Sequence, residues 1–153
     1  MAFTLTSPGF THGAHVPVRF TCDGDDVSPA LQWAHPPTGT AAFALVLDDP
    51  DAPSGTFTHW LMCDIPATAK GLPERFHSDT MGTSGTNDFG RIGYGGPCPP
   101  KGHGVHHYHF HLHALDRRLS LPPAFSRDDL DAALRGHVIG TATLMGTYER
   151  RRR

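Results

Sequence analysis

The stretch HHYHFHLHAL, residues 106–115, decides the fold class of this chain. Successive side chains of a β-strand point to opposite faces, so positions two apart share a face. His106, Tyr108 and the apolar positions 110, 112 and 114 share one face, while positions 107, 109, 111 and 113 put four histidines on the other. The first face is polar at its start and apolar afterwards. This pattern predicts a strand that begins in the wall of a pocket and continues into the core.

Four other segments have the same strand-like character. The chain contains 17 glycines and 14 prolines, which interrupt it often, and the segments between them are rich in Val, Thr, Phe and Leu. Short strands separated by turn residues predict a mainly β fold, an antiparallel β-sandwich. The continuous apolar run AFALVL at 42–47 predicts a central strand covered on both faces. The four segments are residues 15–22, 40–49, 57–65 and 138–148.

One peripheral helix is expected near the C-terminus, in the segment FSRDDLDAALRGHV, residues 125–138. Ser126 is a suitable N-cap, and Asp129 three residues later completes a variant of the capping box. Leu130 and Leu134 then lie on one helical face, and Gly136 stands where a C-terminal cap is expected.

Length and charge limit the possible organisation and partners. A chain of 153 residues suits one domain, residues 1–153, with a single core. A net charge of −2 provides no strong field for nucleic acid or an anionic membrane. No segment approaches the ~18 apolar residues of a membrane span, and the N-terminal residues do not resemble a signal peptide. We therefore expect a cytoplasmic protein with no nucleic-acid partner.

The cysteines and the histidine row carry weaker signals. Cys22, Cys63 and Cys98 are odd in number and irregularly spaced, which argues against a disulfide framework and against zinc ligation. Cys22 and Cys63 are expected to be small buried residues. The four histidines 107–113 fit a shared metal only with cooperative rotamers and a further ligand, so a half-exposed strand face is favoured. No metal and no cofactor are predicted.

The stretch LDDPDAPSGTFTHWL, residues 47–61, places Asp49 and His59 on either side of one hairpin-like excursion. An acidic β-turn is one interpretation, because Asp before Pro is ordinary turn chemistry. The other is that the Asp49 carboxylate reaches the His59 imidazole at the same sheet edge, fixes its tautomer and keeps it charged longer. The sequence leaves both open.

The loop GGPCPPKG, residues 95–102, precedes the histidine-rich strand at the end of a long aperiodic segment, 72–100. Prolines 97, 99 and 100 stiffen it, and its glycines permit close backbone approach to a ligand. Exposed N–H groups in such a loop can form an anion nest, although the sequence does not match a nucleotide P-loop. Cys98 beside His59 or His106 is a thiolate nucleophile in the alternative interpretation.

Together these residues resemble the phosphatidylethanolamine-binding protein family, within it the compact bacterial branch of Raf-kinase-inhibitor-like proteins. The resemblance rests on DGDDVSPALQW (23–33), LDDPDAPSGTFTHWLMCDIPA (47–67), YGGPCPPKGHGVHHYHFHLHALD (94–116) and GHVIGTATLMGTYER (136–150). It covers nearly the whole chain in order. It implies a sandwich of two antiparallel sheets with a peripheral helix, and a small pocket that accepts phosphate or phosphorylated head groups.

Carried over by motif, the resemblance implies a set of ligand-binding residues. Where the family has an arginine between the pocket histidine and tyrosine, this sequence has His107, whose side chain is expected to point away from the pocket. The implied residues are Asp49, His59, Cys98, Pro100, His106 and Tyr108.

The expected function is binding of a phosphate-bearing small molecule or head group, regulatory and without a catalytic residue. The alternative is a hydrolase or lyase that uses His59, His106 and Cys98. A protein partner and a homodimer are further expectations from the family.

Overall fold

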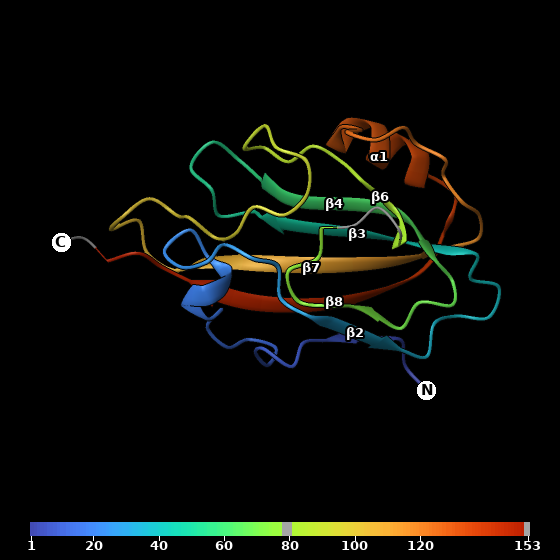
Figure 1. Ribbon diagram of the computed structural model, residues 1–153, viewed down its shortest axis with the longest axis horizontal. Helices are drawn as coiled ribbons and strands as arrows, with labels where there is room; N and C mark the ends of the chain where they lie inside the picture. Colours follow the sequence, from blue (N-terminus) through green and yellow to red (C-terminus); the bar gives the residue numbers. More distant parts are fainter. Residues whose placement is uncertain (78–80, 152–153) are drawn as a thin grey trace.

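The structure, a computed structural model, describes residues 1–77 and 81–151 (Figure 1). Two antiparallel sheets and one short helix account for its regular elements, as the sequence predicts. In chain order the elements are β1 (Thr4–Thr6), the 3₁₀ turn η1 (Val18–Phe20), β2 (Leu31–Ala34), β3 (Ala42–Asp49), β4 (Phe57–Pro66), β5 (Gly71–Leu72), β6 (Thr83–Ser84), β7 (His106–Leu115), α1 (Arg127–Leu134) and β8 (Val138–Tyr148).

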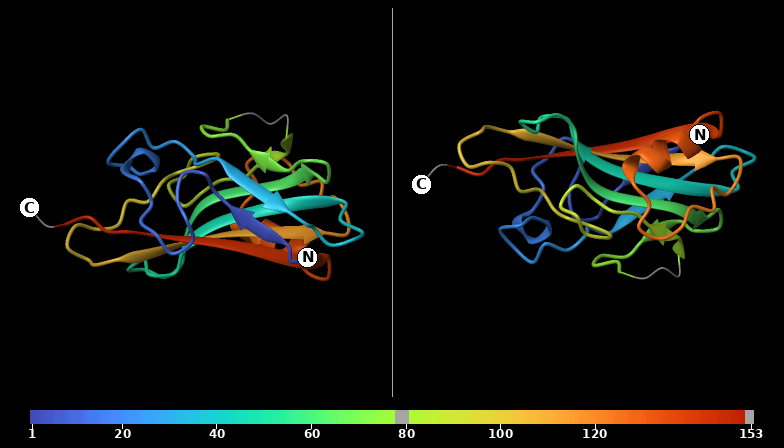
Figure 2. Two further views of the ribbon diagram at one scale, coloured as in Figure 1. Left: turned by 90° about the horizontal axis from the view of Figure 1, so that it is seen from below. Right: turned by 90° about the horizontal axis from the view of Figure 1, so that it is seen from above.

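The larger sheet has five strands in the order β6-β4-β3-β7-β8, with β3 at its centre. Every residue of β3 is buried, because its apolar run is covered on both faces. The smaller sheet, β1-β2-β5, covers one face, and α1 lies over the other (Figure 2). The prediction of a central strand covered on both sides is therefore confirmed.

The main core fills the space between the two sheets. β2 contributes Leu31 and Trp33, β3 contributes Phe43 and Leu45, and β7 contributes Phe110, all nearly inaccessible to water. Along β7 buried positions alternate with exposed or half-buried ones, as period two predicts. The four histidines 107–113 occupy the more open face, which confirms their predicted orientation.

The helix α1 begins where its capping residues predict. The Ser126 hydroxyl accepts a hydrogen bond from the Asp129 amide at 3.0 Å, and the Asp129 carboxylate accepts one from the Ser126 amide at 3.3 Å. A capping residue of this kind stabilises a helix by about 1 kcal/mol. Leu130 packs on the outer face of the sheet, and Gly136 follows the helix at φ 79°. None of the described helices is long and apolar enough to cross a membrane.

One expectation about a segment differs from the structure, and one agrees with it. Residues 15–22 do not form a strand: they contain η1, and only His15 forms a bridge, to Thr147 of β8. Pro17 precedes the turn and fixes the backbone there, which interrupts regular pairing. The long segment 72–100 is mostly irregular and includes β6; its residues 78–80 lie outside the described residues.

The sheet brings three polar strand ends together. β3 ends at Asp49, which pairs with Phe57 at the start of β4, and on its other side β3 pairs with residues 109–115 of β7, with Asp48 opposite His109. Because these strands are antiparallel, the end of β3 and the beginnings of β4 and β7 meet at one end of the sheet. Figure 1 shows the β3–β4 loop and the loop before β7 at this end, on the left, away from α1.

Candidate functional site

A cavity of about 540 Å³ lies at this end of the larger sheet. It contains all six residues that the sequence singles out, together with residues of the β3–β4 loop and two residues of the segment that follows β6. Its walls come from three strand ends and two irregular segments. The lining residues are Asp49, Ala52, Pro53, Ser54, Gly55, Thr56, Phe57, His59, Asp88, Phe89, Cys98, Pro99, Pro100, His106 and Tyr108.

His106, the first residue of β7, is buried beside Asp49, the last residue of β3. Its Nδ1 lies 2.6 Å from Asp49 Oδ2, so the imidazole donates this hydrogen bond to the carboxylate. The other carboxylate oxygen accepts from the Asp51 amide at 2.8 Å. The Asp–His pair of this site is therefore Asp49–His106, and Asp49 does not form the pair with His59 that was one of the two interpretations left open by the sequence. The register between β3 and β7, and not the β3–β4 hairpin, brings His106 to Asp49 as its partner.

The second nitrogen of His106 is also engaged. His103 Nδ1 lies 2.6 Å from His106 Nε2, and the His103 ring stands on the exposed turn before β7. Both nitrogens of His106 are thus hydrogen bonded within the protein. His103 was not among the predicted site residues, because nothing in a Gly-flanked turn reveals where its side chain points.

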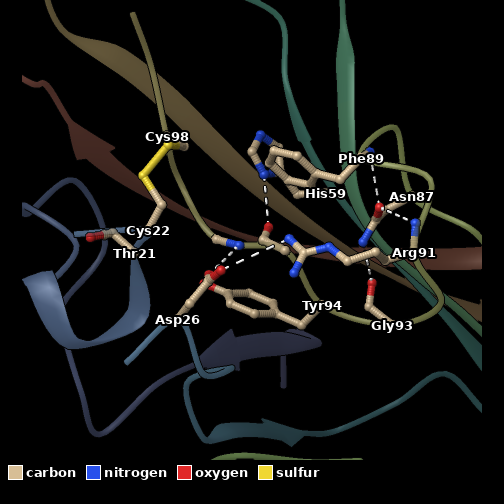
Figure 3. A network of polar contacts seen from close by, with 12 residues as sticks. Thr21, Cys22, Asp26, His59, Asn87, Phe89, Arg91, Gly93, Tyr94 and Cys98 are labelled. Carbon is tan, nitrogen blue, oxygen red and sulfur yellow. Dashed lines mark hydrogen bonds and ion pairs between the residues drawn. A yellow bond between two sulfur atoms is a disulfide. The ribbon is translucent and has the colours of Figure 1, made fainter. Parts of the chain in front are cut away.

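His59 lies deep in the cavity wall and is held by the backbone. Its Nδ1 donates to the Gly95 carbonyl at 2.8 Å, which leaves Nε2 as the ring nitrogen that can serve a ligand (Figure 3). The rings of Phe57, Phe89 and Tyr108 surround it, with centroids 4.9–5.3 Å away. Burial lowers the pKa of His59, although the Gly95 carbonyl opposes this shift. The expectation that His59 stays charged longer is therefore wrong.

Tyr108 presents a buried hydroxyl that lacks a partner among the described residues. Its side chain is 1% exposed and lines the cavity. Burial raises the pKa of Tyr108, and the nearby Asp49 charge raises it further, so the phenol keeps its proton. Buried polar groups are nearly always hydrogen bonded, and an exception requires an explanation. A ligand in the cavity that accepts a hydrogen bond from the Tyr108 hydroxyl is one explanation.

The glycines before β7 pack against the protein and form no anion nest. The Gly95 amide donates to the His59 carbonyl at 2.9 Å, and the Gly96 amide donates to Asp26 Oδ1 at 2.8 Å (Figure 3). A side chain at Gly96 would overlap the Phe20 carbonyl oxygen and the Asp26 carboxylate. The glycine is required for close docking onto the N-terminal segment, so the predicted nest is wrong at these positions.

A hydrogen-bonded loop supports the same wall. The Asn87 side chain donates to the Gly93 carbonyl at 2.9 Å and accepts from the amides of Phe89 and Arg91 at 2.9 and 3.1 Å. Figure 3 shows this loop beside Asp26. It holds Phe89 in the cavity, where its ring meets Phe57 edge to face with centroids 4.7 Å apart.

Cys98 is bonded to Cys22 in a disulfide, and the prediction of unpaired cysteines is wrong for this pair (Figure 3). The bond joins the cavity wall to the segment after η1, 76 residues earlier in the sequence. Cys98 therefore lines the cavity as a disulfide sulfur and has no thiolate to offer. Cys63 is free and fully buried, as expected, and burial raises its pKa to about 12.

Three of the four histidines at 107, 109, 111 and 113 pair with a polar side chain on the outer face of β7. His107 Nδ1 lies 2.7 Å from Asp51 Oδ2, His111 Nε2 lies 3.2 Å from Asp48 Oδ1, and His113 Nδ1 lies 2.9 Å from Thr141 Oγ1. Within residues 1–77 and 81–151, no group of three or more His, Cys, Asp or Glu side chains is arranged to hold a metal ion.

Comparison with known proteins identifies the family of this chain. The family model described as phosphatidylethanolamine-binding protein matches residues 6–149. The chain belongs to the phosphatidylethanolamine-binding protein family. Among solved structures, E. coli YbcL, titled a new member of the mammalian family, superposes with a TM-score of 0.91 at 34% identity, covering 97% of this chain and 99% of YbcL.

Further relatives match nearly the whole of this chain. CT736 of Chlamydia trachomatis, titled a candidate homologue of the family, superposes with a TM-score of 0.90 at 35% identity. The superposition covers 97% of this chain and 98% of CT736. A UPF0098 protein of Aquifex aeolicus is 47% identical over 94% of this chain and 86% of its own. LppC of Mycobacterium tuberculosis, named a candidate lipoprotein, is 43% identical to this chain. The match covers 95% of this chain and 72% of LppC.

In this member of the phosphatidylethanolamine-binding protein family, the cavity also contains residues that sequence reasoning missed. Phe57 and Phe89 supply aromatic walls, and Asp88 stands at the rim, where its carboxylate accepts from the Thr58 amide at 2.7 Å. The FTH segment could have suggested Phe57, since it lies two residues before His59 on the same strand face.

Proposed function

We propose that this protein binds a phosphate-bearing small molecule or head group in the cavity and acts as a regulatory binding protein, not as an enzyme. The observation that carries the proposal is the buried Tyr108 hydroxyl, which has no partner among the described residues. A phenol donates well to an anionic oxygen, and such charge-assisted hydrogen bonds are about twice as strong as neutral ones. A phosphate oxygen would satisfy this donor.

His59 supports the same ligand from the adjoining wall. With Nδ1 committed to Gly95, its Nε2 accepts a hydrogen bond from a protonated phosphate or, once protonated itself, donates one to the dianion. Phe57 and Phe89 exclude water nearby, which strengthens electrostatic contacts. Among the described residues, no lysine or arginine lines the cavity, while Asp49 and Asp88 both lie in it. Arg150 lies just outside, with Nη1 3.6 Å from Cys98 Sγ. Within the lining itself, positive charge for a phosphate comes from protonated imidazoles.

The enzymatic alternative loses one of its three residues. Nucleophilic attack by Cys98 requires a free thiolate, and the Cys22–Cys98 disulfide removes it. The Asp49–His106 pair retains the geometry of an oriented base, so proton abstraction is the second candidate function. Turnover of O-phosphoethanolamine, followed as release of inorganic phosphate, would favour this alternative over simple binding.

Titration calorimetry with inorganic phosphate and O-phosphoethanolamine tests the proposed function. We expect both to bind wild type, to compete with each other, and to bind more tightly as the pH falls below the ordinary histidine range. His59→Ala should weaken both. His137→Ala is the matched control, because His137 pairs with Asp116 on the surface at the other end of the sheet. Indifference of wild type and His59→Ala to both ligands would sink the proposal.

Six residues that line the cavity contact or orient the ligand in this proposal: Asp49, His59, Cys98, Pro100, His106 and Tyr108. We also propose one domain spanning residues 1–153, membership of the bacterial Raf-kinase-inhibitor-like branch, and a homodimer or other protein partner. Sedimentation of the purified chain tests the dimer.

The predicted cytoplasmic location has evidence against it. Disulfides persist mainly in oxidising compartments, with intracellular proteins of hyperthermophiles as the exception, and the Cys22–Cys98 bond is such a disulfide. The name of the relative LppC points the same way for that protein. Cell fractionation with a membrane-impermeant label decides the location.

A further inference from the structure

Three side chains form a hydrogen-bonded chain from the floor of the cavity to the protein surface. Asp49 accepts from His106 Nδ1 at 2.6 Å, and His106 Nε2 lies 2.6 Å from His103 Nδ1. The two imidazoles are arranged head to tail, because each uses one nitrogen toward its inner neighbour and the other toward the outside. His103 uses only Nδ1 in this chain, which leaves Nε2 of an exposed ring in contact with water.

Burial separates the two ends of this chain. The His106 side chain is 2% exposed and Asp49 is 4% exposed, so neither exchanges protons directly with bulk solvent. His103 is exposed on the turn before β7. We propose that His103, His106 and Asp49 form a proton relay, through which His106 acquires positive charge from solvent when an anion enters the cavity. The inference rests on the proposed function, and it adds His103 as a positioning and proton-transfer residue.

The proton balance of the relay follows from the atoms. A buffer acid gives a proton to His103 Nε2, and the Nδ1 proton of His103 passes to His106 Nε2. His103 ends neutral with its proton on Nε2, and His106 ends as an imidazolium that still donates from Nδ1 to the Asp49 carboxylate. The buffer acid becomes its conjugate base, and one positive charge has moved into the cavity wall. No covalent bond other than N–H changes.

The charges around His106 explain why an entering anion needs this proton. Asp49 ends β3 and Asp51 follows it, His59 lies on β4, Tyr108 is two residues away on β7, and Asp88 stands at the opposite rim. Three of these groups are carboxylates, while the tyrosine remains protonated and burial lowers the pKa of His59. Lys101 is in the turn of His103, outside the cavity lining. A dianion beside Asp49 is favoured only if His106 is charged.

The turn places His103 for this role. Its amide donates to the Pro100 carbonyl at 3.1 Å, and the neighbouring Gly102 amide donates to the Arg150 carbonyl at 2.8 Å. Gly102 and Gly104 have φ of 76° and 94°, which a residue with a side chain adopts at a cost. The two glycines let the chain reverse so that His103 lies over His106 and closes the outer side of the cavity wall.

The first experiment needs no ligand and uses the full chain. The solvent exchange of the His106 ring protons is measured by ¹⁵N NMR in wild type and in His103→Gln. Glutamine can still hydrogen bond to His106, but an amide does not relay a proton. The relay predicts exchange at least about tenfold slower in His103→Gln. Equal or faster exchange would overturn the proposal, because a residue that merely covers His106 should expose it when replaced. His137→Gln should match wild type.

The second experiment measures proton uptake on binding of inorganic phosphate, by calorimetry at pH 7 in two buffers of different ionisation enthalpy. Wild type should take up close to one proton per phosphate. The final uptake does not depend on the route, so the relay is tested by its rate: in stopped flow with a pH indicator, His103→Gln should take up the proton at least about tenfold more slowly than wild type. Equal rates in both proteins would overturn the relay. Absence of phosphate binding in wild type would contradict the proposed function instead, and the exchange measurement would then decide the relay alone.

Discussion

The ring of Tyr108 meets the ring of His59 edge to face, with 5.3 Å between their centroids. Both residues line the same cavity, yet they differ in what they already bind. His59 is anchored by the Gly95 carbonyl, whereas the Tyr108 hydroxyl has no partner among the described residues. An unsatisfied buried polar group costs about 1–3 kcal/mol. A ligand oxygen that accepts a hydrogen bond from this hydroxyl would remove that cost.

Replacing Tyr108 by Phe should separate stability from binding. The variant loses a hydroxyl that is unpaired in the folded protein, so its free energy of unfolding should equal that of wild type or exceed it by about 1 kcal/mol. Its affinity for inorganic phosphate should fall about tenfold, because one charge-assisted donor is lost. Urea unfolding and titration calorimetry measure the two quantities.

Tyr148→Phe provides the matched control for Tyr108→Phe. The Tyr148 hydroxyl donates to Asp23 Oδ2 at 2.6 Å, outside the cavity lining, so its removal should lower stability by about 1 kcal/mol and leave phosphate affinity unchanged. Unchanged affinity in Tyr108→Phe would show that the hydroxyl does not serve the ligand.

The Cys22–Cys98 disulfide should make a large contribution to stability. It closes a loop across a sequence separation of 76 residues, and a loop of that length restricts the unfolded chain strongly. The double variant Cys22→Ser/Cys98→Ser should lose about 2–4 kcal/mol of unfolding free energy in urea. Dithiothreitol should destabilise wild type by a similar amount.

A thiol count under native conditions checks the same bond. Cys63 is buried, and burial raises its pKa to about 12, so it should not react with an alkylating reagent at neutral pH. Oxidised wild type should therefore be unmodified, while reduced wild type reacts at the two positions. Alkylation of Cys98 in untreated protein, or an effect of dithiothreitol on the double variant, would contradict the assignment.

Local sequence patterns were sufficient to predict most of the fold. The alternation in residues 106–115 predicts which face of β7 is buried, and the apolar run before Asp48 predicts the central strand. Ser126 and Asp129 predict the start of α1, since a capping box depends on neighbouring residues only. The segment at 15–22 misled because its composition suits a strand while its proline prevents regular pairing.

The site depends on contacts between distant segments, and there the sequence was less informative. All six predicted residues line the cavity, but the choice of His106 over His59 as partner of Asp49 depends on how β3 and β7 align. The Cys22–Cys98 bond joins two of three cysteines that composition alone cannot pair. Gly96 was expected to approach a ligand and instead packs against Asp26. Both roles require a residue without a side chain, so the sequence does not distinguish between them.

The histidines on the outer face of β7 should make the protein sensitive to acid. The rings of His111 and His113 stack with centroids 6.3 Å apart. Burial, followed by the charge of His111, lowers the pKa of His113 to about 4. An unfolded chain returns this group to its ordinary pKa of about 6.5, so between these values the unfolded state binds more protons. Stability is therefore fully present above about pH 6.5 and falls as the pH drops toward 4.

His113→Gln should remove much of this loss. The glutamine keeps a polar partner for Thr141 Oγ1, which lies 2.9 Å from His113 Nδ1, but it does not titrate. The difference in unfolding free energy between pH 7 and pH 4 should shrink by on the order of 2 kcal/mol, with allowance for water at a partly exposed ring. Thr141→Val should lower stability at every pH and leave the pH dependence unchanged, because it removes the hydrogen bond and not the titrating group. Parallel pH profiles for wild type and His113→Gln would show that another group controls acid unfolding.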